Sequence, residues 1–229
     1  MGDLYKYLKR SYADDLITRG TVRIGTLYEY RKIDLKNTAR TDFMEGSQIF
    51  RVEGSISTSR PSAGLDYIRR FTNFQGSELS GDNAFVHEIG SPDCYLYCTT
   101  SSFDERAMSE FGDDACVRII DPHAFFEIIT AELARRALVK SAAVVAECIY
   151  GPKSQPFTSD NPGKLAGWRL KPMAHAHQRE VRAMWIPVNE TPHRSACVRS
   201  FLDDDKLLLP FEIISCAALA STRIVERVI

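Results

Sequence analysis

The chain has 229 residues, of which 44% are hydrophobic and 26% are charged, and its formal net charge is −1. These values are typical of a globular protein with a sizeable buried core, and the length suits one domain. The near-zero net charge excludes a global basic field that would draw the protein to DNA or to a membrane surface. No run is apolar and long enough to span a membrane, and the first residues lack a signal-peptide core, so we expect a cytoplasmic protein. The six cysteines form no CxxC pair and several lie in apolar runs, which predicts reduced thiols and no zinc knuckle.

Hydrophobic alternation and turn residues predict more strands than helices. A strand at residues 4–8 precedes a helix that Ser11 caps and Gly20 closes, and a second strand follows at residues 21–27. Further strands are predicted at residues 49–57, 84–87, 94–98, 116–120, 143–150, 178–186, 207–214 and 221–228. Further helices are predicted at residues 104–111 and 121–139, the second starting at Asp121-Pro122. Because the helices are scattered among the strands, we expect an α+β fold. We expect residues 1–229 to form a single domain with a mainly antiparallel, split sheet and a few flanking helices.

The strand at residues 178–186 carries polar side chains in an otherwise apolar setting. Alternation along a strand puts Gln178, Glu180 and Arg182 on one face. Such residues are costly beside buried apolar groups unless they face a cleft or each other. We expect this strand to lie inside the sheet rather than at its edge. The pattern predicts either a cleft-lining site or an exposed face, with Arg182 paired to Glu180 or Asp42.

Two other segments supply polar groups that could complement this strand. The first strand is basic and aromatic, and the aromatic strand at residues 94–98 runs into three hydroxyls. A second hydroxyl triplet, at residues 57–59, follows a poorer apolar strand and competes for the same role. The candidates that we prefer are Lys6, Tyr7, Arg10, Thr99, Thr100 and Ser101.

Residues 34–46 are dense in charge and poor in aliphatic side chains. They predict a loop, either solvated or facing a substrate, because loops on rigid scaffolds often carry ligand contacts. We expect the charged residues of this region to gather near the cleft: Arg31, Arg40, Asp42 and Glu45.

The order of these pieces resembles the ADP-ribosyltransferase superfamily. Its arginine-containing class has a basic residue on the first strand, a Ser-Thr-Ser triplet after an apolar strand, and a Gln/Glu-x-Glu on a later strand. Here the triplet reads Thr-Thr-Ser, and Lys6 stands where the family has Arg. The chain is also similar to a broad bacterial domain family of unknown function, often found near defence genes. Members of that family begin Leu-Tyr-Lys-Tyr, carry a Cys-Phe-Ser-type strand midway and end in a Glu-Tyr-Arg-like strand.

The resemblance implies an enzyme that consumes NAD by ADP-ribosyl transfer or hydrolysis, without a metal, in the role of a bacterial toxin or an anti-phage defence effector. Glu180 would hold the ribose 2′-hydroxyl and stabilise an oxocarbenium-like transition state, and Gln178 would orient the acceptor. The hydroxyls would brace Glu180 and the ribose, and Lys6 or Arg10 would meet the diphosphate. The acceptor would be a protein, a nucleic acid or a small molecule, and an antitoxin is a candidate protein partner. Because a carboxylate in a cleft is seldom needed for stability, we expect Glu180→Gln to leave folding almost unchanged.

Three alternatives stay open at this stage. The first is a non-catalytic binding module that keeps the superfamily shape. The second is a nucleic-acid-acting defence effector that uses the basic pairs Arg69-Arg70 and Arg135-Arg136. The third, a metal bound by His175 and His177, is disfavoured because no acidic or cysteine partner lies at a motif spacing.

Overall fold

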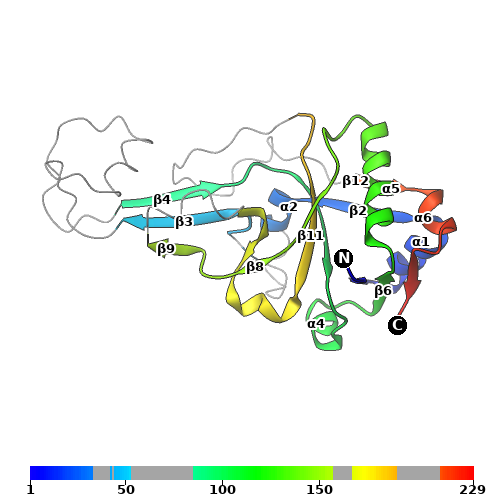
Figure 1. Ribbon diagram of the computed structural model, residues 1–229. Helices are drawn as coiled ribbons and strands as arrows, with labels where there is room; N and C mark the ends of the chain where they lie inside the picture. The colour runs from blue at the N-terminus through cyan, green and yellow to red at the C-terminus, as the bar shows by residue number, and fades with distance from the viewer. Residues whose placement is uncertain (33–41, 43, 53–84, 157–166, 190–211) are drawn as a thin grey trace, which may run out of the picture.

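The computed structural model describes residues 1–32, 42, 44–52, 85–156, 167–189 and 212–229 (Figure 1). Its main feature is an eight-stranded sheet whose strand pairs are antiparallel. This confirms the α+β class with a mainly antiparallel sheet. The strands are β1 (Leu4–Leu8), β2 (Thr21–Thr26), β5 (Tyr95–Thr100), β6 (Ala115–Ile119), β7 (Val144–Glu147), β11 (Glu180–Trp185), β12 (Glu212–Ser215) and β13 (Val225–Arg227).

The sheet divides at β5. On one side β11 pairs with the whole of β5, from Glu180 opposite Thr100 to Trp185 opposite Tyr95. On the other side β2 pairs with the first residues of β5, at Tyr95 and Leu96, while β1 pairs at Thr100. Among the described strands, none pairs with residues 97–99 of β5 on that side, so β2 and β1 diverge into two branches. β11 is an inner strand, as the sequence predicted, because β7 covers its other edge.

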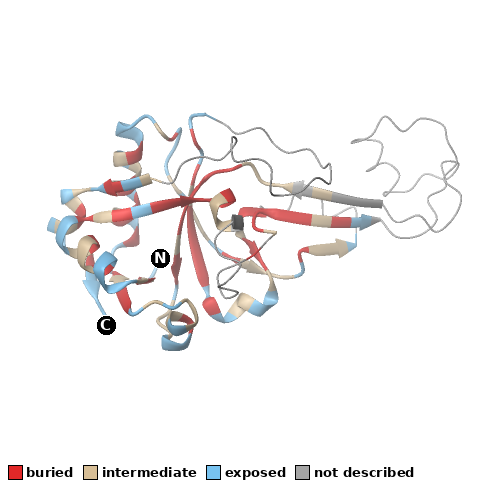
Figure 2. Cartoon of the chain, turned by 180° about the vertical axis from the view of Figure 1, so that it is seen from behind, coloured by how far each residue is buried: buried red, intermediate tan, exposed pale blue. Residues whose placement is uncertain are grey.

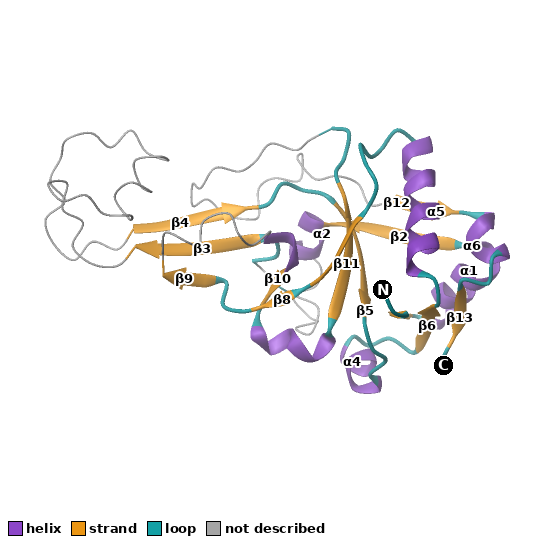
Figure 3. Ribbon diagram, viewed as in Figure 1, coloured by secondary structure: helices purple, strands orange, loops and turns teal. Residues whose placement is uncertain are grey.

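A smaller sheet projects away from this body (Figure 1). It consists of β3 (Ser47–Val52), β4 (Phe85–Gly90) and β9 (Ser154–Pro156), in the order β4-β3-β9. A short parallel pair, β8 (Ile149–Tyr150) and β10 (Leu170–Lys171), lies between it and β11 (Figure 3). This pair places Lys171 beside Tyr150, next to the start of β11.

Helices cover the main sheet and follow from local signals. The α-helices are α1 (Arg10–Arg19), α2 (Leu27–Lys32), α4 (Glu105–Glu110), α5 (Pro122–Arg135) and α6 (Ala217–Ser221). Asp121 caps α5 through a bond from the Ala124 N–H, with Pro122 at the first position, as predicted. Gly20 closes α1 in the left-handed region, at φ 64°. Buried apolar residues of α5 pack on the sheet (Figure 2). Among them, Phe126 meets Trp185 edge to face.

Several local predictions were wrong. α1 begins at Arg10 with Lys9 at its N-cap and no side-chain cap, so Ser11 does not start it. α5 ends at Arg135 rather than near residue 139, because Ala137 takes a positive φ of 56°. The strand predicted at 143–150 breaks at Cys148, where the chain leaves β11 for β10. The helices α2 and α6 were not predicted.

The described thiols are free, in Cys94, Cys98, Cys116, Cys148 and Cys216, whereas Cys197 lies outside the described residues. Within the described part of the chain, no helix combines the length and apolarity needed to cross a membrane.

Candidate functional site

A cavity of about 630 Å³ opens where β1 and β2 separate from β5. Its walls come from β1, α1, β2, β5, β10 and β11, together with Glu45. The candidates from the sequence that line it are Lys6, Tyr7, Glu45, Thr99, Thr100, Gln178, Glu180 and Arg182. Segments that are far apart in the sequence therefore meet at one hollow, and Arg10, Asp42 and Ser101 are not part of its lining.

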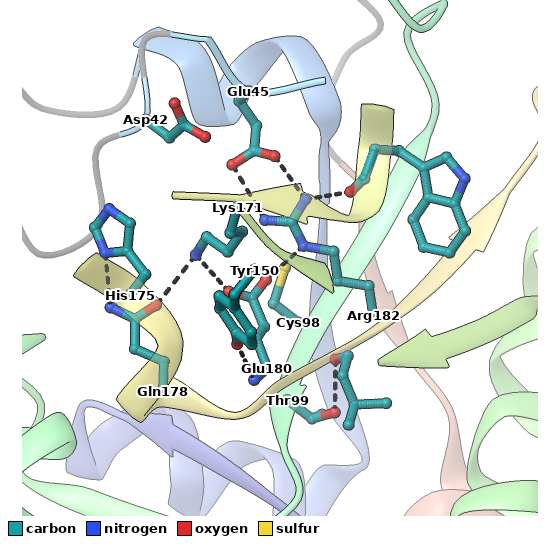
Figure 4. Close-up of polar contacts among 12 residues, drawn as sticks. Asp42, Glu45, Cys98, Thr99, Tyr150, Lys171, His175, Gln178, Glu180 and Arg182 are labelled. Atoms are coloured by element: carbon teal, nitrogen blue, oxygen red, sulfur yellow. Dashed lines mark hydrogen bonds and ion pairs between the residues drawn. The ribbon is translucent and has the colours of Figure 1, made fainter. Parts of the chain in front are cut away.

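Glu180 is the first residue of β11 and is only 7% exposed. Both carboxylate oxygens accept hydrogen bonds from cations: Arg182 Nε donates to Oε1 at 2.6 Å, and Lys171 Nζ donates to Oε2 at 2.5 Å (Figure 4). The Glu180 backbone N–H donates to the Tyr150 hydroxyl at 2.7 Å. The carboxylate is therefore fixed in place between two buried positive charges.

Arg182 extends this network to the segment before β3. Its Nη1 and Nη2 donate to the two oxygens of Glu45, at 2.6 and 3.1 Å, in the paired geometry that strengthens arginine–carboxylate bonds. Nη1 also donates to the Trp168 carbonyl. Glu45, Lys171, Glu180 and Arg182 are each buried, and their formal charges sum to zero. A neutral total is what makes a buried cluster of this size tolerable.

Neighbouring charges, more than burial, determine whether Glu180 and Lys171 are ionised. Burial by itself would raise the pKa of Glu180, but the charges and hydrogen bonds of Arg182 and Lys171 outweigh it and hold that pKa well below its usual range. Burial would lower the pKa of Lys171, yet the Glu180 charge raises it above its ordinary value. Beside them, burial and the Glu180 charge raise the pKa of the Cys98 thiol to about 12. Glu180 is therefore ionised and Cys98 protonated at neutral pH.

Gln178 reaches the site from an unexpected element. It ends the 3-10 helix η2 (Met173–Gln178), and Arg179 then takes the left-handed conformation, φ 45°, before β11 begins. The prediction that Gln178 lies on the strand itself was therefore wrong. Its side chain still lies beside Glu180, because Lys171 Nζ donates to Gln178 Oε1 at 3.1 Å as well as to Glu180 (Figure 4).

The hydroxyls at the end of β5 do not bond to Glu180. Thr99 Oγ1 donates to the Val181 carbonyl at 3.0 Å, and Thr100 Oγ1 donates to the Ser102 carbonyl at 2.8 Å. Ser101 is exposed, and its backbone N–H donates to the Arg179 carbonyl. The expectation that these hydroxyls brace Glu180 was wrong, since Lys171, Arg182 and Tyr150 take that place.

The basic residue of the first strand lies in the gap between β1 and β2. Lys6 Nζ donates to the Cys98 carbonyl at 2.7 Å and lies 4.8 Å from the centre of the Tyr97 ring. Tyr7 accepts a bond from the Asp104 N–H at 2.7 Å, which ties β1 to the start of α4. Arg10 is exposed at the start of α1, away from the cavity lining.

The charged loop contributes unevenly. Glu45 lines the cavity. Asp42 is buried outside the cavity lining, with its Oδ2 2.9 Å from Lys153 Nζ. Arg40 and the side chain of Arg31 lie outside the described part of the chain.

Sequence reasoning missed Lys171 and Tyr150 as partners of Glu180, and it considered His175 only as a metal ligand. Lys171 belongs to a strand of two residues, too short to show a hydrophobic period. The only local signal was a lysine held between Leu170 and Pro172 next to the predicted site strand.

The residues behind the alternative functions are engaged elsewhere. His177 contacts the Ala174 carbonyl through Nδ1 and Glu110 through Nε2, and His175 contacts Gln178. In the described residues, no group of three or more His, Cys, Asp and Glu side chains is arranged to hold a metal ion. Arg135 and Arg136 pair with Glu132. The pair at residues 69–70 and the triplet at residues 57–59 lie outside the described residues.

Comparisons with models of protein families, with curated proteins and with solved structures found no match.

Proposed function

We propose that the chain is an ADP-ribosyltransferase-like enzyme that consumes NAD, by transfer of ADP-ribose to an acceptor or to water. The observation that carries the proposal is the shared cavity. Lys6, Thr99, Gln178 and Glu180 come from three distant segments and line one hollow at the split in the sheet. A carboxylate can stabilise the oxocarbenium-like state through which a nicotinamide–ribose bond breaks, and the resemblance to ADP-ribosyltransferases gives an amide and a cation to the same site.

The rest of the lining suits a dinucleotide. Tyr5, Tyr12 and Phe111 offer aromatic faces against which a planar base can stack. Lys6 offers a cation to the diphosphate. In this reading the diphosphate lies toward β1 and the scissile ribose lies toward β11.

Glu180 keeps the capacity to bind a ribose hydroxyl although two cations hold it. An ionised carboxylate has about four acceptor sites, and Lys171 and Arg182 occupy one on each oxygen. The remaining lone pairs can accept the ribose 2′-hydroxyl. Because the Glu45 charge offsets that of Arg182, the four-residue cluster presents no net positive charge to the developing oxocarbenium.

A non-catalytic binding module is the second candidate, and the double ion pair of Glu180 favours it. A carboxylate that is paired with two cations stabilises an oxocarbenium less than an unpaired carboxylate in the same site would. This candidate predicts that the cavity binds NAD without cleaving it.

Nicotinamide release separates the two candidates. Purified wild type is incubated with NAD beside Glu180→Gln and Leu133→Ala. Leu133 is fully buried in α5 and does not line the cavity, so its truncation, at about 2–5 kcal/mol, serves as a control for lost stability. We expect Glu180→Gln to lower the rate about a hundredfold to a thousandfold, while Leu133→Ala keeps the wild-type rate below its melting temperature.

Each other outcome has a defined reading. Wild type that binds NAD by calorimetry and releases no nicotinamide is a binding module. Wild type that releases nicotinamide no faster than Glu180→Gln uses another catalytic residue. Wild type that neither binds nor cleaves NAD contradicts both candidates.

A further inference from the structure

The side-chain amide of Gln178 is held between two groups of opposite character (Figure 4). Lys171 Nζ lies 3.1 Å from Gln178 Oε1, and His175 Nδ1 lies 3.3 Å from Gln178 Nε2. An ammonium group has hydrogen-bond donors and no acceptor. The amide oxygen must therefore face Lys171, and the amide NH₂ must face His175.

This orientation fixes the hydrogen on the His175 ring. A nitrogen that faces an NH₂ group has to accept, so Nδ1 of His175 carries no hydrogen and Nε2 carries it. His177 differs, because its Nδ1 lies 3.1 Å from the Ala174 carbonyl and its Nε2 lies 2.9 Å from a Glu110 carboxylate oxygen, and both of these oxygens accept hydrogen bonds. The two rings therefore differ at Nδ1, which faces a hydrogen-bond donor in His175 and an acceptor in His177.

We propose that His175 is a positioning residue that, as a neutral imidazole with Nδ1 as acceptor, completes a hydrogen-bonded chain of fixed polarity through Gln178 and Lys171 to Glu180. The chain holds the Gln178 amide in one orientation at the cavity wall. This role rests on the proposed function, in which Gln178 orients the acceptor. A protonated His175 would set N–H against N–H and release the amide.

The surroundings of His175 keep it neutral near pH 7. Burial and the Lys171 charge lower the pKa of His175, Asp42 and Glu180 raise it, and His177 lowers it, with a net shift below the ordinary value. The Gln178 contact is thus complete above about pH 6.5, the ordinary histidine pKa, and is lost as the pH falls through the lowered pKa.

The test is spectroscopic and needs no activity. Long-range ¹⁵N spectra of the histidine rings, with assignments from His175→Asn and His177→Asn, report which nitrogen carries hydrogen. We expect a bare Nδ1 and a hydrogen on Nε2 in His175 at pH 7.5. A hydrogen on Nδ1 of His175 at that pH would overturn the proposal.

The side-chain NH₂ signals of Gln178 provide the second readout, assigned from Gln178→Ala. We expect them to be shifted in wild type, to titrate together with the His175 ring, and to lose the shift in His175→Leu. His175→Asn should restore it, because the Asn oxygen can supply an acceptor near the position of Nδ1.

Thermal melts show whether each variant is folded, and His177→Asn is the matched control, since its ring contacts Ala174 and Glu110. Gln178 signals that ignore His175 protonation, or that are the same in His175→Leu, contradict the positioning role. An absence of nicotinamide release would contradict the proposed enzymatic function. The spectra would still show independently whether the hydrogen-bonded chain through His175, Gln178 and Lys171 exists.

Discussion

Replacing Glu180 by Gln should destabilise the fold strongly. The four charges of Glu45, Lys171, Glu180 and Arg182 sum to zero in the buried cluster, and Glu180→Gln leaves a net charge of +1 there. The new amide NH₂ also has to face one of the two cations, which can only donate. This overturns the expectation from sequence that a cleft carboxylate contributes little to stability.

The size of the effect follows from the burial. Removing one partner of a buried ion pair typically costs about 3–5 kcal/mol, and Glu180 serves two partners that are both nearly inaccessible. For a chain of this length, about 1 kcal/mol shifts the melting temperature by about 2–4 °C. We therefore expect a fall in melting temperature of about 6–20 °C.

Urea unfolding and thermal melts of purified variants measure this loss of stability. Glu127→Gln is the matched control, because the Glu127 side chain is 67% exposed and its change should stay within about 0.5 kcal/mol. Adding Lys171→Met to Glu180→Gln restores a neutral cluster. The free energy of unfolding should therefore fall less in the double variant than the sum of its falls in the two single variants. A Glu180→Gln protein as stable as Glu127→Gln would refute the reasoning.

Four further results are expected. The stability supplied by the Glu180 ion pairs should be fully present above about pH 4.3, the ordinary Glu pKa. It should be lost as the pH falls from there toward the depressed pKa of the folded state. Urea unfolding over a pH series should therefore show that the free energy of unfolding falls less steeply with acid in Glu180→Gln than in wild type. Cys98 should react slowly with iodoacetamide at pH 8 in the folded chain and faster in Glu180→Gln, because its pKa of about 12 depends partly on the Glu180 charge. Peptide mass spectrometry measures the extent of Cys98 alkylation over time. Gly20→Ala should cost more than about 1 kcal/mol in urea unfolding, because φ is +64° and a Cβ would lie 1.9 Å from the Cys216 carbonyl oxygen. Lys6→Met should weaken NAD binding by calorimetry, whereas an unchanged affinity would remove Lys6 from the diphosphate site.

Local signals in the sequence were enough for much of the fold. Asp121-Pro122 marked the start of α5 because a capping side chain and a proline act within one helical turn. Gly20 marked the end of α1 for a similar reason, since the left-handed conformation that ends a helix favours glycine. The polar residues Glu180 and Arg182, two positions apart, indicated a functional face on an inner strand without any knowledge of its neighbours.

The partners of that face could not be read from the sequence. Glu45 pairs with Arg182 across 137 positions, and Lys171 comes from a strand of two residues. Gln178 lies on a 3-10 helix, although alternation placed it on the strand. Periodicity and capping report a residue's relation to its own element, within a few positions along the chain.

Which charge neutralises a buried carboxylate depends on how the elements pack. Here the split between β1 and β2 makes the cavity, and the parallel pairing of β8 and β10 delivers Lys171 to its wall. The sequence alone determined that Glu180 belongs to a polar face on an inner strand. Only the tertiary structure decided that Glu180 is buried and bound by two cations, because burying a carboxylate requires charges that the fold must bring from distant segments.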